Sequence, residues 1–378
     1  MSYAPSPSVR RLLALCRKES FQIVRDPSSI VIAFVLPIAL LMIFGYGVNL
    51  DANRVRVGVL LEDSGPDAAH FAATLTASPY LETHVATSRA ALDGWLDTGK
   101  IRGMAIVQAD FGARLERPGD QAPIEIVTDG AEPNTANFVA AYLSGAWRSW
   151  MTQRAADRGL VSVAPIEVIP RYWFNSAAKS KNFIVPGSIA IIMTIIGALL
   201  TSLVVAREWE RGTMEALLST PVTRTELLLS KILPYYVLGI ASMLLCLAIG
   251  VWQFGVPFRG SLLLLIVFTT LFLGSSLGLG LLLSTVTRNQ FNAAQAALNA
   301  AFLPATMLSG FVYEISSMPP VIRAVTYLIP ARYFVGALQT LFQAGFVGHV
   351  LLQDFLFLTV SAVFFLGFTA LKTRLRLD

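Results

Sequence analysis

The stretch FIVPGSIAIIMTIIGALLTSLVVA at residues 183–206, followed by REWERGTMEALLSTPVTRTEL at residues 207–227, decides the class of fold. The first part has no charged side chain, whereas the second mixes acids and bases. A helix needs about 20 apolar residues to cross a hydrocarbon core roughly 30 Å thick. Residues 183–206 therefore predict a membrane span that ends abruptly in a charged segment.

The whole chain has the composition of a membrane protein. Of its 378 residues, 54% are hydrophobic and 14% are charged, and the mean hydropathy is +0.61. These values are too apolar for an ordinary soluble domain. We expect a multi-pass α-helical membrane protein with six transmembrane helices, at residues 30–48, 183–206, 232–252, 261–285, 291–312 and 351–371.

Residues 50–180 differ from the rest of the chain because they hold 15 of its 24 acidic residues. Strand-like runs at 54–62, 101–108 and 123–129 alternate with helix-like runs at 66–77, 87–99 and 133–157. This alternation predicts an α/β domain inserted between helices 1 and 2.

Lysine and arginine follow the predicted loops unevenly, which orients the chain. One set of short segments, which includes both termini, carries thirteen of these bases, and the opposite set carries three. We therefore expect both termini in the cytoplasm, the 50–180 domain outside the cytoplasm, and a bacterial inner-membrane location. The thirteen are Arg10, Arg11, Arg17, Lys18, Arg25, Arg207, Arg211, Arg224, Lys231, Arg288, Lys372, Arg374 and Arg376; the three are Arg259, Arg323 and Arg332.

No chemical motif in the sequence indicates catalysis or metal binding. Residues 94–100 (GWLDTGK) match the first seven positions of a phosphate-binding loop, but Ile101 occupies the place of the required Ser or Thr. A helix that ends at Gly99 explains the segment better. The three histidines have no metal-ligand spacing, so we expect no metal and no cofactor on this chain.

The predicted spans are read as free of acids and bases, apart from the charged segment that begins at Arg207. Ion-coupled carriers usually place ionisable groups at mid-membrane depth. We therefore expect the energy for any uphill transport to come from the cytoplasmic side.

The leader at residues 1–29 alternates apolar and basic residues at helical spacing until Asp26-Pro27. This pattern predicts an amphipathic helix on the inner leaflet. A basic tail that only sets topology is the alternative. The bases concerned are Arg10, Arg11, Arg17, Lys18 and Arg25.

The 207–222 loop reads as a short helix between two stops. Gly212 breaks the preceding helix, Thr213 can cap a new one, and Thr220-Pro221 ends it. Thr223 and Glu226 form a capping box for the next helix. The acids at 208, 210 and 215 and exposed Leu217 and Leu218 suit docking to a partner protein, although a solvated turn packed against neighbouring spans fits equally well.

ERGTMEALLSTPV at residues 210–222 resembles the cytoplasmic signature of the ABC-2 type transporter permeases, the membrane subunits of ATP-binding cassette exporters. The resemblance covers essentially the whole chain and is closest to the bacterial multidrug-efflux-like subgroup with a large external domain after the first span. Further similar motifs are RYWFN at 171–175, VPG at 185–187, LP at 303–304, LSGF at 308–311, MP at 318–319 and LIPARYF at 328–334.

The resemblance implies a permease subunit, not an enzyme, that moves a lipophilic or amphipathic, drug-like substrate outward. ATP and magnesium would bind a separate ATPase subunit, and a second permease copy, the same chain or a paralogue, would complete the pore. It also implies two sets of site residues. The ATPase-coupling set is Arg207, Glu208, Glu210, Arg211, Gly212, Thr213, Glu215, Leu217, Leu218, Thr220 and Pro221; the pore set, beside an external re-entrant segment at 313–335, is Pro304, Ser309, Gly310, Phe311, Pro319 and Pro330.

Two further expectations concern partners and function. A periplasmic adaptor and an outer-membrane channel are possible partners of the 50–180 domain, and membrane lipid is another; nucleic acid is not expected. The alternative function is a membrane receptor or assembly scaffold with a ligand-sensing external domain. Residues 372–378 form the predicted cytoplasmic tail.

Overall fold

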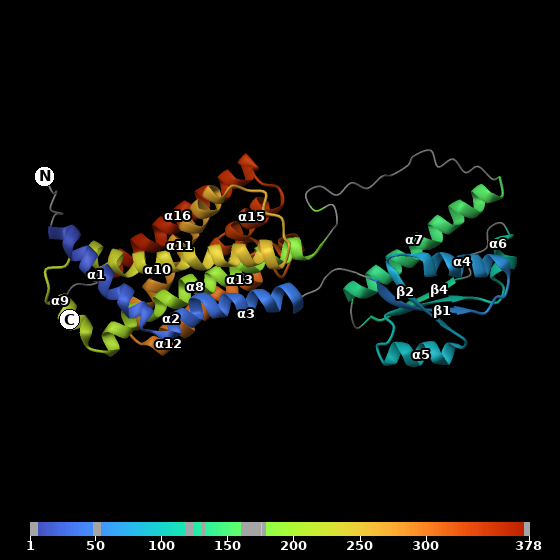
Figure 1. Ribbon diagram of the computed structural model, residues 1–378, viewed down its shortest axis with the longest axis horizontal. Helices are drawn as coiled ribbons and strands as arrows, with labels where there is room; N and C mark the ends of the chain where they lie inside the picture. The colour runs from blue at the N-terminus through green and yellow to red at the C-terminus, as the bar shows by residue number, and fades with distance from the viewer. Residues whose placement is uncertain are drawn as a thin grey trace. The chain divides into compact units, whose positions relative to one another are not determined.

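The computed structural model describes residues 7–47, 54–117, 124–130, 133–159, 175 and 179–373. The chain forms two compact units, which are described separately (Figure 1). The helical unit comprises Met1–Asn49 and Tyr172–Asp378, and the α/β domain comprises Leu50–Arg171. The predicted motif at 171–174 and the tail beyond Thr373 lie outside the described residues.

The helical unit begins with α1 and a first span built from four short helical segments. Its elements are α1 (Pro7–Val24), α2 (Pro27–Ile30), η1 (Val31–Val35), α3 (Leu36–Met42), η2 (Ile43–Gly47), α8 (Lys181–Glu210), α9 (Thr213–Leu218), α10 (Arg224–Ala248), η3 (Ile249–Gln253), α11 (Leu262–Thr287), α12 (Gln290–Ala297), η4 (Leu298–Phe302), α13 (Leu303–Leu308), η5 (Ile315–Ser317), α14 (Pro320–Thr326), α15 (Pro330–Gln343) and α16 (Gly348–Lys372).

Five helices among the described residues are long and apolar enough to cross a membrane. They are Pro27–Gly47, Lys181–Glu210, Arg224–Gln253, Leu262–Thr287 and Gly348–Lys372. They match predicted spans one to four and six. The chain is therefore a multi-pass helical membrane protein, and the count of six spans stays a prediction.

The predicted fifth span at 291–312 is not among these five helices. Its residues form α12, η4 and α13, which end at Leu308. Gln290, Asn292, Gln295 and Asn299 place amide side chains in the first half of this run, and amides make a helix too polar to count as an apolar span.

α14 and α15 form a bent pair at the predicted re-entrant segment. The two helices meet at an angle of 77°, which fits either a broken span or a re-entrant loop. Pro330 is in the first turn of α15, where its missing N–H costs nothing. The second helix runs to Gln343, well past the predicted end at residue 335.

α8 is the most buried helix of the bundle. It packs against α3, α10, α11, α12 and α15 (Figure 1), and 83% of its most apolar window is buried. Close packing depends on Gly197, where a Cβ would lie 2.1 Å from the Ser276 hydroxyl of α11. Gly274 and Gly278 of α11 face Ala362 and Leu366 of α16, so this G-x-x-x-G pair serves packing within the chain.

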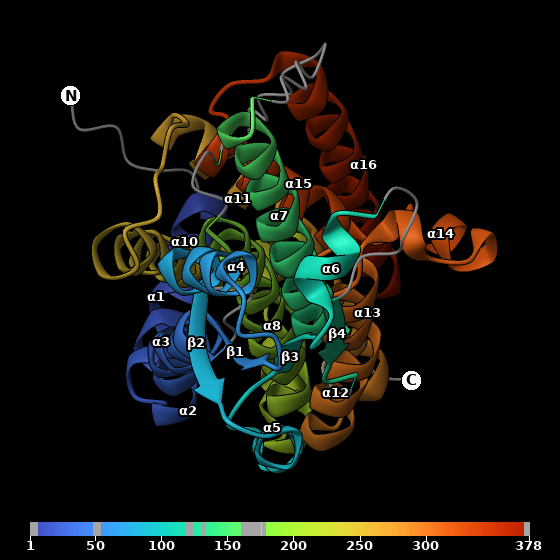
Figure 2. The same cartoon turned by 90° about the vertical axis from the view of Figure 1, so that its right-hand side faces the viewer.

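The α/β domain contains a four-stranded sheet in the order β2-β1-β3-β4 (Figure 2). β1 (Val55–Leu61) pairs in parallel with β2 (Leu81–Ala86) and β3 (Gly103–Val107), and β4 (Ile124–Thr128) is antiparallel to β3. The helices are α4 (Pro66–Ala77), α5 (Arg89–Asp97), α6 (Phe111–Leu115) and α7 (Pro133–Asp157). β2 and α6 were not predicted. β2 (LETHVA) has three consecutive polar residues in its middle, which hide the strand pattern, and α6 is little more than one helical turn.

Helices cover both faces of this sheet. α4 and α7 lie on one face and α5 on the other (Figure 1). Phe71 of α4 and Trp150 of α7 belong to one buried cluster of the domain, and Leu92 of α5 belongs to a second. Gly94 lies inside α5, and Gly99 follows its end with φ +68°. The segment that resembles a phosphate-binding loop is therefore a helix with a glycine at its end, as expected.

Candidate functional site

The 207–222 loop has the structure that its sequence predicts, with one difference. α8 ends at Glu210 with Arg211 as its C-cap, and Gly212 then adopts φ +68°, a conformation that is unfavourable for residues with a Cβ. Gly212 itself is the residue before α9, so Thr213 begins that helix and does not cap it. Thr223 and Glu226 form the predicted capping box at the start of α10.

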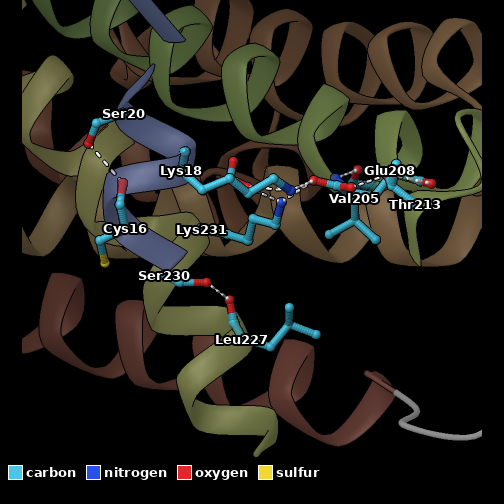
Figure 3. A network of polar contacts seen from close by, with 11 residues as sticks. Cys16, Lys18, Ser20, Val205, Glu208, Thr213, Leu227, Ser230 and Lys231 are labelled. Atoms are coloured by element: carbon cyan, nitrogen blue, oxygen red, sulfur yellow. Dashed lines mark hydrogen bonds and ion pairs between the residues drawn. The ribbon is translucent and has the colours of Figure 1, made fainter. Parts of the chain in front are cut away.

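Glu208 lies at the centre of a buried ion-pair network that joins three helices (Figure 3). Its Oε1 atom accepts from Lys18 Nζ of α1 at 2.6 Å and from Lys231 Nζ of α10 at 2.7 Å. Lys231 also pairs with Glu19 of α1. The side chains of Glu19, Glu208 and Lys231 are each only 3% exposed. The hydroxyl of Thr213 also donates to the Glu208 carboxylate, which connects α9 to the same network.

Two more ion pairs hold α1 and its neighbouring turn on the bundle. Arg207 pairs with Asp26 at 2.9 Å, and Arg11 pairs with Glu226 at 3.1 Å. Burial acts to raise the pKa of Asp26, but hydrogen bonds from Ser29 and the Arg207 charge outweigh it and hold that pKa below its usual range. The leader therefore contacts the helical unit through charge.

Of the three acids that were expected to suit docking to a partner, Glu208 is buried and is not accessible for that role. Glu210 instead accepts hydrogen bonds from the backbone N–H (2.7 Å) and the side chain of Gln290. Leu217 is half-buried rather than exposed, and the side chain of Leu218 lies outside the described residues. The loop residues that are exposed are Glu210, Arg211, Gly212, Thr213, Glu215, Ala216, Ser219, Thr220 and Pro221.

α1 confirms the predicted helix, and apolar side chains are exposed on its surface. Val9, Leu13, Phe21 and Val24 are exposed on it, and Arg17 lies over the Phe21 ring at 5.5 Å. Arg10, Arg17 and Arg25 are exposed, whereas Arg11 and Lys18 form the ion pairs described above. This mixture of apolar and basic residues is typical of a helix at a membrane interface.

A cavity of about 230 Å³ lies beside the ion-pair network. Glu208, Met214 and Lys231 line one part of it, and Trp209 and Arg288 line another. The Arg288 guanidinium lies 4.4 Å from the centre of a Trp209 ring. The end of α8 is therefore surrounded by α1, α9, α10 and the turn after α11.

The pore set predicted by resemblance brings distant motifs together. The Phe311 ring occupies the space beside Gly187, where a Cβ would lie 2.3 Å from it. The same ring meets Phe44 of η2 edge-to-face at 5.7 Å. Pro304 is in the first turn of α13, and Ser309 is buried directly after that helix. Gly310 follows with φ +87°, and Pro319 precedes α14. Their role in a pore stays a prediction.

The expectation that the six stretches contain no acid or base is wrong at Asp354. This residue lies inside the predicted stretch 351–371 and in α16, and only 8% of it is exposed. Its Oδ2 atom has no hydrogen-bond partner among the described residues. The signal is the acidic residue itself, since Asp354 is the one charged side chain within residues 351–371. Groups of three or more metal-ligating side chains do not occur in the described part of the chain.

Comparison with known proteins identifies the family. Residues 27–371 match the model of the family described as "ABC-2 family transporter protein". The chain is 59% identical to "Probable multidrug ABC transporter permease YbhS" of Escherichia coli K12 over 99% of both chains. It is 31% identical to "Probable multidrug ABC transporter permease YbhR" of the same organism, over 86% of this chain and 87% of that one. It is also 22% identical to "Linearmycin resistance permease protein LnrN" of Bacillus subtilis 168, over 89% of this chain and 92% of that one.

The matched region covers the five candidate membrane spans, except for Lys372 at the end of the last one, and contains the 207–222 loop. A family model that covers this much of the chain, together with a relative of nearly equal length, establishes the relationship. The chain belongs to the ABC-2 family of transporter proteins.

Proposed function

We propose that this chain is the permease subunit of an ATP-binding cassette exporter that moves a lipophilic or amphipathic, drug-like substrate outward. ATP hydrolysis takes place on a separate ATPase subunit. The observation that carries the proposal is the network around Glu208, because it fixes a short exposed helix, α9, to the end of the central helix α8. The multidrug names of the two Escherichia coli relatives support the substrate class.

The geometry supports mechanical coupling. A force applied to α9 reaches α8 through Glu208 and Thr213, and it reaches α1 and α10 through Lys18 and Lys231. Buried charges that lose a partner are costly, so these helices move together more readily than they separate. An ATPase that displaces α9 therefore displaces the end of the central helix.

The ATPase-docking role belongs to the exposed residues of the loop. Arg211 and Glu215 are exposed and have no ion pair with a described residue, so they offer both signs of charge to a partner. Arg207 and Glu208 act inside the protein, as parts of the linkage. This division revises the coupling set inferred from resemblance.

The docking test is co-purification with the ATPase subunit after charge reversal. Arg211→Glu combined with Glu215→Lys keeps the net charge and should abolish recruitment while membrane insertion is retained. Glu314→Lys, at an exposed position outside the loop, is the control. Recruitment that survives the double reversal would show that the loop does not dock the ATPase.

Asp354 favours a second candidate function, an ion-coupled carrier, because an acidic residue within a membrane span is by default a functional candidate. The energy source is tested in membrane vesicles that contain the permease and its ATPase. Transport should persist when an uncoupler collapses the proton gradient at constant ATP, and it should stop without ATP. Loss of transport on uncoupling, together with its loss in Asp354→Asn, would establish the carrier instead.

The remaining proposals concern place and partners. Both termini lie in the cytoplasm, the protein lies in the bacterial inner membrane, and a second permease copy completes the pore. Cys16 of α1 is half-buried and Cys246 is buried, so an impermeant maleimide should label Cys16 only from the cytoplasmic side. Labelling of Cys16 in intact cells would show that the N-terminus lies outside the cytoplasm and would contradict the proposed orientation.

The α/β domain is proposed to receive substrate and to transfer it to a periplasmic adaptor and outer-membrane channel. A domain of this size far exceeds the 2–8 residues that connect adjacent helices. Replacement of residues 55–175 by a flexible linker should leave insertion and ATPase association intact and should end export across the envelope. Export at the normal rate by the deleted form would show that the domain is an accessory.

A further inference from the structure

The α/β domain contains a cavity of about 330 Å³ between α7 and the sheet. Its walls are apolar: Phe71 of α4, Ile124 and Ile126 of β4, and Leu143 and Trp147 of α7. Small-molecule sites commonly have volumes of about 300–1,000 Å³ and are lined by aromatic and aliphatic side chains with a few polar groups. This cavity has the size and the lining of such a site.

The strand β4 provides the open side of the cavity. Ile124 and Ile126 are two positions apart on it, so both point to the same face of the sheet. β4 is an edge strand of the described sheet, since β3 is its only neighbour there. Ile126 of β4 is 37% exposed. An exposed isoleucine beside an aromatic wall leaves apolar surface that a ligand can cover.

Arg148 is the polar group that distinguishes this cavity. It lines the cavity together with Ser144, and its only hydrogen bond to a described residue runs from Nε to the Ser144 carbonyl at 3.3 Å. Five other arginines around the sheet form carboxylate pairs. Arg148 has no ion pair with a described carboxylate, which also holds for Arg54, Arg56 and Arg117, but of these four arginines Arg148 alone lines the cavity. The paired arginines are Arg89, Arg102, Arg114, Arg154 and Arg158.

We infer that this cavity binds an amphipathic anion, with its hydrocarbon or aromatic body against Trp147 and its acidic group on the Arg148 guanidinium. A guanidinium presents its N–H groups in a fixed fork that matches a carboxylate or phosphate. The inference rests on the proposed function, because it identifies the cavity as a station for exported substrate and the substrate as an acidic amphipath.

The binding test uses the full-length protein in nanodiscs of zwitterionic lipid. The probe is dansyl-undecanoic acid, and its methyl ester is the uncharged match. Trp147 lines the cavity, so tryptophan-sensitised dansyl emission reports occupancy after subtraction of empty nanodiscs. The acid should bind more tightly than the ester.

Three variants separate charge from shape. Arg148→Gln should weaken the acid about tenfold or more, as expected for loss of a charge-assisted hydrogen bond, and should leave the ester unchanged. Ser144→Phe fills the cavity and should abolish binding of both. Arg117→Gln removes an equal charge from an exposed position outside the cavity lining and should behave like the wild type.

Export of the same probes decides the role in transport. In vesicles with the ATPase, Arg148→Gln should slow export of the acid at limiting concentration and spare the ester. The inference is overturned if Arg148→Gln binds the acid with wild-type affinity, if the ester binds as tightly as the acid, or if export of the acid is unchanged when binding is lost. Failure of the proposed function is distinguishable, because the wild type would then export neither probe with ATP while the binding test still decides the cavity.

Discussion

Replacement of Lys231 by methionine is the sharpest test of the network at the end of α8. Methionine keeps most of the length of the lysine side chain and removes its charge. In the wild type, Lys231 contacts both Glu19 and Glu208, and all three side chains are 97% buried. The variant leaves two buried carboxylates to share one lysine, Lys18, which is 44% exposed.

The expected cost follows from that imbalance. Removal of one partner from a buried ion pair costs about 3–5 kcal/mol, because the other charge stays buried without compensation. Lys18 lies 2.6 Å from Glu208 and 3.5 Å from Glu19, so it retains part of the interaction. We expect Lys231→Met to lower the free energy of unfolding by about 3 kcal/mol, at the low end of this range.

A second substitution tests whether charge is the reason. Glu19→Gln in the Lys231→Met background removes the excess negative charge, and it should restore about 1.5 kcal/mol or more, a coupling typical of residues in contact. Arg10→Met is the control, because Arg10 is exposed on the same helix, and surface substitutions usually change stability by less than about 0.5 kcal/mol.

Two measurements check this prediction in nanodiscs. Thermal unfolding gives stability, and the rate of maleimide labelling at Cys16 reports whether α1 leaves the bundle, because Cys16 lies one turn before Glu19 and buried Cys246 does not respond. Labelling should accelerate in Lys231→Met and return toward the wild-type rate in the double variant. A loss below about 1 kcal/mol, or no recovery with Glu19→Gln, would refute the role of the network.

Three further predictions concern single positions. Gly212 has φ +68° with open space around it, so substitution should cost about 1–2 kcal/mol, more for valine than for asparagine; equal effects of both in thermal unfolding would argue against backbone strain. Gly197→Ala should cost about 1–3 kcal/mol through its clash with Ser276, whereas Gly367→Ala, which has open space in α16, should not. The hydrogen bond from Arg154 lowers the pKa of Asp67 in the folded protein. The stabilisation is therefore present above the unfolded pKa of about 3.9, and it is lost as the pH falls through the lower folded pKa. In pH-dependent unfolding, Asp67→Asn should reduce the loss of stability at acid pH, whereas Asp97→Asn, at an exposed site, should not.

The apolar periodicity and the residues that begin or end helices predicted much of the local structure. Residues 66–77 and 133–157 were expected as helices with the bounds that α4 and α7 have, because a proline begins each and the apolar pattern is regular. The capping box at Thr223 was also predictable, since it depends on two side chains three residues apart. Such features need only neighbouring residues.

Tertiary relations were not predictable in the same way. Glu208 looks like one of several exposed acids in the sequence, and only the placement of α1 beside α10 shows that it is buried between Lys18 and Lys231. The predicted span at 291–312 stays a prediction, because amides at Asn292, Gln295 and Asn299 reduce the apolar character that defines a span. The contact of Phe311 with Gly187 joins motifs that are far apart in the chain.

The position of charge explains why the loop can be both attached and exposed. Buried acids and bases are expensive unless each has a partner, and in this bundle they concentrate where α1, α8, α9 and α10 meet. A hydrophobic contact at the same place would tolerate sliding, because dispersion and burial have little directional preference. A lysine shared between two carboxylates allows one arrangement, since displacement of any helix leaves a charge without its partner. The same chemistry that makes Glu208 unsuitable as a docking residue therefore makes it suitable for transmitting the movement of α9 to the membrane helices.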